Sequence, residues 1–96
     1  MGAQLTFSTD SREDGVVLLV ASGEIDLSNV DAFGGALADA TRNGTAIVDL
    51  RGVEYLDSGG IHALFTYADK IRIRTGPLLM PVLTVSGLAE LVDVEQ

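Results

Sequence analysis

The sequence predicts a single α/β domain over residues 1–96, with a mixed β-sheet and helices packed mainly on one side. Two observations lead to this prediction. Apolar runs with β-branched residues alternate along the chain with segments whose apolar residues recur at helical spacing, which is typical of a sheet covered by helices. The length of 96 residues suits one domain, and no linker, internal repeat or low-complexity segment divides the chain.

The chain begins with an expected hairpin. Residues 4–9 alternate in strand fashion, with Leu5 and Phe7 on one face, and a polar turn follows over residues 10–15. The run over residues 15–22 is continuously apolar and rich in β-branched residues. This run predicts a central strand that is buried on both faces.

A helix is expected next. Ser28 is its predicted N-cap, apolar residues repeat at helical spacing over residues 30–40, and Gly44 follows its end. Gly34 and Gly35 lie inside this helix, where each costs about 1 kcal/mol relative to alanine. Either another group approaches that face closely, or the helix is simply soft.

The remaining elements complete an expected order of β-β-α-β-α-β-α with a short tail. A strand over residues 45–50 is followed by a helix that starts at Ser58 and whose apolar face consists of Ile61, Leu64, Phe65 and Ala68. A strand over residues 71–75, exposed on one face, comes next, and then a helix that starts at Pro77, is distorted or confined by Pro81 and ends at Ser86-Gly87. A helix-to-strand segment over residues 88–95 closes the chain.

The chain is acidic and lacks cysteine. Its 14 acidic and 6 basic residues give a formal charge of −8, so its surface repels nucleic acid and anionic lipid and suits a basic protein partner better. No apolar stretch is long enough to span a membrane and no signal peptide is visible, so we expect a cytoplasmic protein that binds neither nucleic acid nor membrane. One histidine and no metal-spaced cluster give no reason to expect a metal or a cofactor.

The segment from Ile47 to Ile61 is the most informative part of the chain. It predicts a buried strand, a short turn, and then Asp57-Ser58-Gly59-Gly60 at the start of a helix. A serine hydroxyl is thereby expected at a helix N-terminus, where unpaired N–H groups and a partial positive charge favour a phosphate. The alternative is that Ser58 only caps the helix.

These residues resemble a known protein family. The order of elements, the segment Gly23–Asp26 (GEID) after the second strand, and Val48–Leu50 (VDL) leading into Tyr55–Ile61 (YLDSGGI) are similar to the STAS domain, and more narrowly to the bacterial anti-sigma factor antagonists. The closing segment Val82–Leu88 is similar to the last helix of that family. The resemblance covers nearly the whole chain and implies a STAS-like fold.

The resemblance implies a phosphorylation switch in a protein that is not itself an enzyme. Ser58 matches the family's phosphoacceptor. The implied partner is an anti-sigma factor that is also a serine kinase. The unphosphorylated form binds it and frees a sigma factor for transcription, phosphorylation ends the binding, and a phosphatase reverses it. The residues implied at the partner-binding surface are Glu24, Asp26, Asp57, Gly59, Gly60, Ile61 and His62.

The sequence departs from the family's pattern in two places. Gly59 stands where serine, threonine or alanine is usual. Only Asp69 and Lys70 separate the helix expected to reach Ala68 from the strand that starts at Ile71, so either this helix is clipped or a segment is missing.

The same residues are compatible with other functions. One alternative is a STAS scaffold or sensor subunit without a phosphorylation cycle, or an accessory of lipid transport. A more distant one is a small hydrolase, because His62 lies four residues after Ser58 on the same helical face. The opposing interpretation to a hydrolase is that His62 is a surface or rim histidine. Glu24 and Asp26 are either a carboxylate pair, solvated turn residues or partner contacts.

The strands carry a few more polar residues. Asp49 is either a buried, hydrogen-bonded acid or the lip of a groove, and Arg51 is a possible partner, with the objection that strand neighbours point to opposite faces. Arg72 and Arg74 are expected to form a solvated basic stripe on one strand face. The oligomeric state is not predicted.

Overall fold

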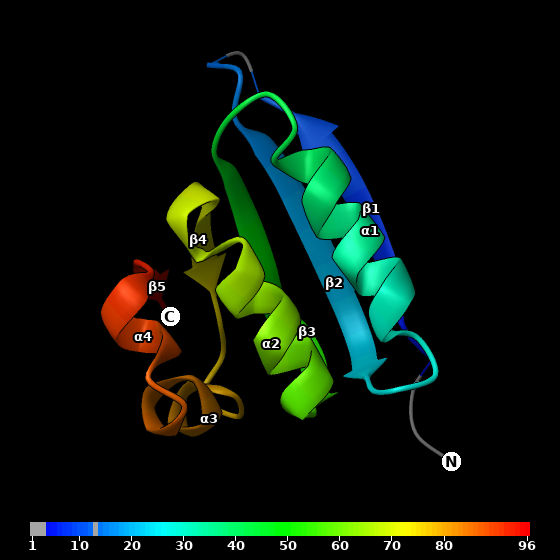
Figure 1. Cartoon of the computed structure of the whole chain (residues 1–96), viewed down its shortest axis with the longest axis vertical. Coiled ribbons are helices and arrows are strands. Elements are labelled where there is room, and N and C mark those ends of the chain that lie inside the picture. Colours follow the sequence, from blue (N-terminus) through cyan, green and yellow to red (C-terminus); the bar gives the residue numbers. More distant parts are fainter. Residues whose placement is uncertain (1–3, 13) are drawn as a thin grey trace.

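The computed structural model describes residues 4–12 and 14–96, which form a five-stranded mixed sheet covered by helices on one face (Figure 1). In chain order the elements are β1 Thr6–Ser11, β2 Val17–Ile25, α1 Val30–Ala40, β3 Ala46–Leu56, α2 Ser58–Thr66, the 3-10 turn η1 Ala68–Lys70, β4 Ile71–Arg74, α3 Met80–Val85, α4 Leu88–Leu91 and β5 Val94–Glu95. The predicted α/β class is confirmed.

The strands lie in the sheet in their chain order, β1-β2-β3-β4-β5. The pair β1 and β2 is the antiparallel hairpin expected from the sequence, and all later pairs are parallel. Each parallel connection passes through helix, and such crossovers are right-handed. Because every crossover moves the same way across the sheet, the helices lie on one face: in Figure 1, α1, α2 and α4 are in front of the strands and α3 is at the lower end of the sheet.

The core lies between this helical layer and the sheet. Alternate strand residues point into it, and helices α1 and α2 contribute the opposing side chains. Fully buried members include Leu19, Ile25, Val48, Leu50 and Ile73 from the strands and Phe33, Leu37 and Leu64 from the helices.

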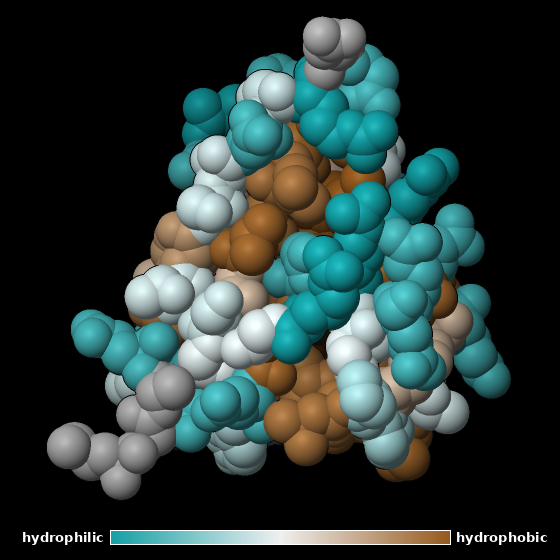
Figure 2. All heavy atoms as spheres, turned by 180° about the vertical axis from the view of Figure 1, so that it is seen from behind, coloured by the Kyte–Doolittle hydropathy of each residue, from teal (hydrophilic) through white to brown (hydrophobic). Residues whose placement is uncertain are grey.

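The other face of the sheet is not covered by helices. Figure 2 shows this face, where apolar atoms in its middle lie between polar side chains. Leu18 and Val20 point to it and are only half-buried, so the expectation that β2 is buried on both faces is wrong. Its apolar run reflects a central position in the sheet and not a second helical layer.

Strand β3 is longer than predicted. The sequence indicated a strand over residues 45–50 and then a turn, whereas β3 continues to Leu56. Its pairing with β2 shifts register between Val20 and Ser22 and again between Gly23 and Glu24. These irregularities interrupt the alternation of buried and exposed residues, which is why the second half of β3 does not resemble a strand in the sequence. The expected turn over residues 10–15 is also shorter, since β1 runs to Ser11, and residue 13 lies outside the described residues.

Two helix ends differ from the prediction. Helix α2 ends at Thr66, before Ala68, and the turn η1 makes the short connection to β4, so the helix is clipped. Helix α3 starts at Met80 and not at Pro77, and Pro81 lies in its first turn. A proline there distorts nothing, because the N–H it lacks has no partner in the first turn.

Candidate functional site

The residues expected at the site gather at the carboxyl ends of β2 and β3. Glu24 is paired with Tyr55 and Ile25 with Leu56, and the Asp57 backbone N–H donates to the Ile25 carbonyl at 3.2 Å. The turn after β2 and the start of α2 therefore lie side by side. In open α/β sheets this edge of the parallel strands is the usual place for a binding site.

Asp57, and not Ser58, caps helix α2. Asp57 has extended backbone angles, and its Oδ1 atom accepts a hydrogen bond from the Gly60 backbone N–H at 3.1 Å. Ser58 is the first helical residue; its side chain is exposed and makes no hydrogen bond to the described part of the chain. The alternative in which Ser58 only caps the helix is therefore wrong, and its hydroxyl is left free at the helix N-terminus.

The two glycines after Ser58 have different surroundings. Gly60 is buried, and a Cβ atom there would overlap Leu56 and lie 3.0 Å from Cγ2 of Ile25. Glycine at this position lets the first turn of α2 lie directly on the sheet. Gly59 is partly exposed, and a Cβ there would lie 3.3 Å from Asp57 Oδ1 and 3.5 Å from Val30. Of this pair, only Gly59 is accessible to solvent.

The next two residues point in different directions. Ile61 is half-buried and packs against the core, whereas His62 is exposed. No hydrogen bond joins His62 to Ser58 within the described residues, although one turn of α2 separates them. A nucleophilic serine needs a base within hydrogen-bond reach and an oriented third group, and the geometry here provides no such arrangement.

The turn after β2 is held by its own side chains. Asn29 Oδ1 accepts from the Asp26 backbone N–H at 3.0 Å, and Asn29 Nδ2 donates to the Glu24 carbonyl at 2.9 Å. The Asp26 carboxylate accepts from the Ser28 backbone N–H at 2.9 Å and from its hydroxyl. Ser28 is thus not the N-cap of α1; Asn29 occupies that position without a capping side-chain bond. Asn29 was not predicted from the sequence; its three-residue spacing from Asp26 was the available signal.

A shallow groove of about 360 Å³ runs between helices α1 and α2, next to Ser58. Helix α1 contributes three residues to its walls and α2 four, and the residue after α2 completes them: Val30, Asp31 and Gly34, then Gly59, His62, Ala63 and Thr66, then Tyr67. This groove was not predicted from the sequence, where a close approach at the face of Gly34 and Gly35 was one of two alternatives and a soft helix was the other. The groove depends on the distance between two helices, which no local pattern specifies.

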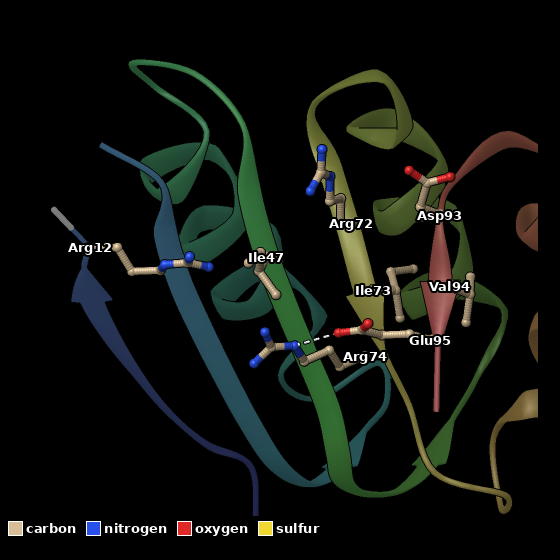
Figure 3. Close-up of a pocket in the computed structure, with 8 residues that line it drawn as sticks. All are labelled: Arg12, Ile47, Arg72, Ile73, Arg74, Asp93, Val94 and Glu95. Carbon is tan, nitrogen blue, oxygen red and sulfur yellow. Dashed lines mark hydrogen bonds and ion pairs between the residues drawn. The ribbon is translucent and has the colours of Figure 1, made fainter. Parts of the chain in front are cut away.

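A separate polar region lies on the uncovered face of the sheet. Asp49 is buried and accepts hydrogen bonds from Arg51. The objection that these two side chains point to opposite faces is wrong, because residues two apart on a strand share a face. Farther along, Arg12, Arg72 and Arg74 border a hollow of about 320 Å³ floored by Ile47, and Arg74 binds Glu95 at 2.8 Å (Figure 3).

Two negative observations apply to residues 4–12 and 14–96. No three histidine, aspartate or glutamate side chains gather in a way that could hold a metal ion. None of the helices in this part of the chain has the length and apolar character needed to cross a membrane.

The chain is similar to several known proteins. The model of the family described as "Mlab, STAS domain" matches residues 8–94. An anti-sigma factor antagonist from Mycobacterium paratuberculosis is 23% identical, with a TM-score of 0.86 over 96% of this chain and 86% of that one. The anti-sigma factor antagonist SpoIIAA in its unphosphorylated form is 17% identical, with a TM-score of 0.70 over 95% and 89% of the two chains. The Bacillus cell fate determinant SpoIIAA in the phosphorylated form is 17% identical, with a TM-score of 0.69 over 95% and 92%.

At these identities the likeness to the solved structures establishes the fold, and the family model establishes the family. No curated protein gives a significant sequence match to this chain.

Proposed function

The chain belongs to the STAS domain family, and from this premise we propose that it is a cytoplasmic anti-sigma factor antagonist switched by phosphorylation of Ser58. The unphosphorylated form binds an anti-sigma factor that is also a serine kinase, and a sigma factor is released. Transfer of a phosphate from ATP to the Ser58 hydroxyl ends this binding, and a phosphatase restores it. The chain itself is the substrate and not an enzyme.

The free hydroxyl of Ser58 is the observation that carries the proposal. Asp57 supplies the cap that a serine would otherwise provide, so modification of Ser58 removes no hydrogen bond from the described part of the fold. The first N–H groups of a helix and its dipole favour an added phosphate at this position. The phosphorylated chain is therefore expected to keep its fold.

The loss of binding follows from the surface around Ser58. Leu27, in the turn after β2, is 84% exposed, and Tyr55, near the end of β3, is 50% exposed. A partner that binds over the carboxyl ends of β2 and β3 must remove water from the exposed Ser58 side chain. A phosphate adds a charge of about −1.5 to −2, and Asp57 already makes the edge negative. Burying that charge without a paired cation is costly.

The similarity to SpoIIAA also supports the proposal. That protein is known in an unphosphorylated and in a phosphorylated form, and both have the same fold as this chain. A fold that is kept in both states suits a switch that works at the surface. Such a switch requires no rearrangement of the core.

The test is the intact mass of the purified chain after incubation with ATP and candidate anti-sigma factor kinases from the same organism. We expect one added phosphate on the wild type and none on Ser58→Ala. Ser28→Ala is the matched control, because Ser28 is also an exposed serine near the start of a helix and should not affect phosphorylation.

Two other results would change the proposal. A complex that forms with ADP or ATP but carries no phosphate would leave an antagonist without a kinase cycle. Neither phosphate nor complex with any candidate would indicate a STAS scaffold or sensor subunit. In addition, a Ser58→Asp variant that binds the kinase as tightly as the wild type would contradict the charge mechanism.

A further inference from the structure

We propose that the groove between α1 and α2 receives an apolar side chain of the anti-sigma factor kinase, and that Gly34 keeps this groove open. The inference rests on the proposed function and adds a second anchor point to the surface around Ser58. It assigns a role to a glycine that the fold itself does not require.

The chemistry of the groove indicates the kind of group it accepts. Val30, Ala63 and the ring of Tyr67 line it, together with the backbone at Gly34 and Gly59. Asp31, His62 and Thr66 contribute the polar groups. An aliphatic or aromatic side chain inserted between the two helices would cover apolar surface that is now in contact with water, and each buried methylene contributes about 0.8 kcal/mol.

The surroundings of Gly34 show that the fold does not need a glycine there. A Cβ atom built on Gly34 meets no other atom within 4 Å. Its backbone has no positive φ angle, so an L-residue fits without strain. Glycine in a helix interior nevertheless costs about 0.5–1 kcal/mol relative to alanine. The groove offers a reason for this cost, because any side chain at Gly34 would occupy part of it.

Gly35 provides the comparison. A Cβ there also meets nothing within 4 Å, and the residue is exposed, but it does not line the groove. The structure gives no reason for a glycine at this position. The two neighbours therefore share a helix, a chain context and a backbone conformation, and they differ in whether their side chains would enter the groove.

The position of the groove identifies its occupant. Gly59 belongs both to its wall and to the turn that presents Ser58, so the groove and the phosphorylation site form one continuous surface. A kinase that reaches the Ser58 hydroxyl lies over exposed His62 at the edge of the groove. A second copy of this chain is a poorer occupant, because each copy carries a net charge of −8 and two copies repel each other.

The experiment compares Gly34→Leu with Gly35→Leu. For each full-length variant, the dissociation constant of the kinase complex and the rate of Ser58 phosphorylation are measured, together with the melting temperature and the oligomeric state. We expect Gly34→Leu to weaken binding by about tenfold or more, as for loss of an interface anchor. Gly35→Leu should bind like the wild type. Both variants should be at least as stable as the wild type.

Each other outcome overturns a defined part of the argument. If the kinase phosphorylates the wild type and binds both leucine variants equally well, the groove is not an anchor, while the proposed function stands. If no kinase binds the wild type, the proposed function fails and the groove proposal fails with it. A change of oligomeric state confined to Gly34→Leu would make a second copy the occupant and overturn the proposal.

A further pair of variants needs no partner at all. Gly34→Ala and Gly35→Ala should both raise the melting temperature, because alanine is the better helix former. If Gly34→Ala alone lowered it, the fold would require this glycine, and the argument for an open groove would be wrong.

Discussion

Asp49 and Arg51, two residues apart on β3, form a bidentate ion pair on the uncovered face of the sheet. Arg51 Nε donates to Asp49 Oδ1 at 3.0 Å and Nη2 donates to Oδ2 at 2.7 Å, and the Arg51 backbone N–H donates to Oδ1 at 3.0 Å. The side-chain hydrogen bonds from Arg51 are the main cause that lowers the pKa of Asp49 below its ordinary value of 3.8, and the nearby charge of Arg74 acts in the same direction.

The first prediction concerns Asp49→Asn and acid stability. At neutral pH this variant should lose about 1 kcal/mol of unfolding free energy, because a charged acceptor is replaced by a neutral one. Folding lowers the pKa of this carboxylate, so the carboxylate stabilises the folded state fully when the pH is above its pKa in the unfolded chain. The stabilisation is lost as the pH falls through its pKa in the folded chain. The difference between wild type and variant should therefore shrink as the pH drops below 3.8. Denaturant unfolding across this pH range measures it.

Glu54→Gln is the matched control for this prediction. Glu54 is an exposed acid on β3 and makes no side-chain hydrogen bond within the described residues. Its substitution should change stability by less than about 0.5 kcal/mol at every pH. A wild-type advantage over Asp49→Asn that stays constant into strong acid would contradict the role assigned to the ion pair.

The second prediction separates capping from phosphorylation at the start of α2. Asp57→Ala removes the hydrogen bond to the Gly60 N–H and should lower the unfolding free energy by about 1 kcal/mol. Ser58→Ala removes no such bond and should change it by less than about 0.5 kcal/mol. Thermal unfolding of the two variants checks this. A larger loss of stability in Ser58→Ala than in Asp57→Ala would mean that Ser58 caps the helix.

Much of the fold could be predicted because secondary-structure patterns are local. The alternation of strand and helix, and the hairpin at the start, follow from the spacing of apolar residues. The burial of β2 could not be predicted, since Leu18 and Val20 are apolar whether or not a second helical layer covers them. The length of β3 was also missed, because its register shifts place Arg51 and Gly52 consecutively at the surface.

The site was predicted in part for a similar reason. Ser58 stands at a helix N-terminus as expected from the order of residues. The assignment of caps failed by one residue in two places, at Asp57 and at Asn29. Serine, aspartate and asparagine are comparable as caps, and the choice among them depends on backbone angles that no sequence pattern specifies. The groove beside Gly34 depends on how two helices pack.

The third prediction concerns the two glycines after Ser58. Gly60→Ala should destabilise the chain by about 1–3 kcal/mol, because the added methyl group would overlap Leu56 and press on Ile25 in the core. Gly59→Ala should cost less than about 1 kcal/mol, since the nearest atom belongs to the Asp57 side chain, which can move slightly. Denaturant unfolding distinguishes the two. Equal effects would mean that α2 is free to shift away from the sheet.

The fourth prediction concerns Asn29, which holds the turn carrying Glu24 and Asp26. Asn29→Ala removes two hydrogen bonds, one from the Asp26 N–H and one to the Glu24 carbonyl. A loss of about 1–2 kcal/mol in unfolding free energy is expected, as for two partly buried hydrogen bonds. Ser28→Ala is the control, because its hydroxyl makes one exposed bond to Asp26, and it should cost less than about 0.5 kcal/mol.

Asn29→Asp keeps the acceptor for one of these bonds, removes the donor of the other and adds a charge. The aspartate keeps an oxygen that can accept from the Asp26 N–H but has no donor for the Glu24 carbonyl, and it adds a negative charge beside two others. It should therefore be destabilised at least as much as Asn29→Ala. Amide hydrogen exchange of the Asp26 and Asn29 N–H groups reports on the turn directly. Unchanged protection of these amides in Asn29→Ala would show that backbone bonds alone, such as Asn29 N–H to the Asp26 carbonyl at 3.1 Å, hold the turn.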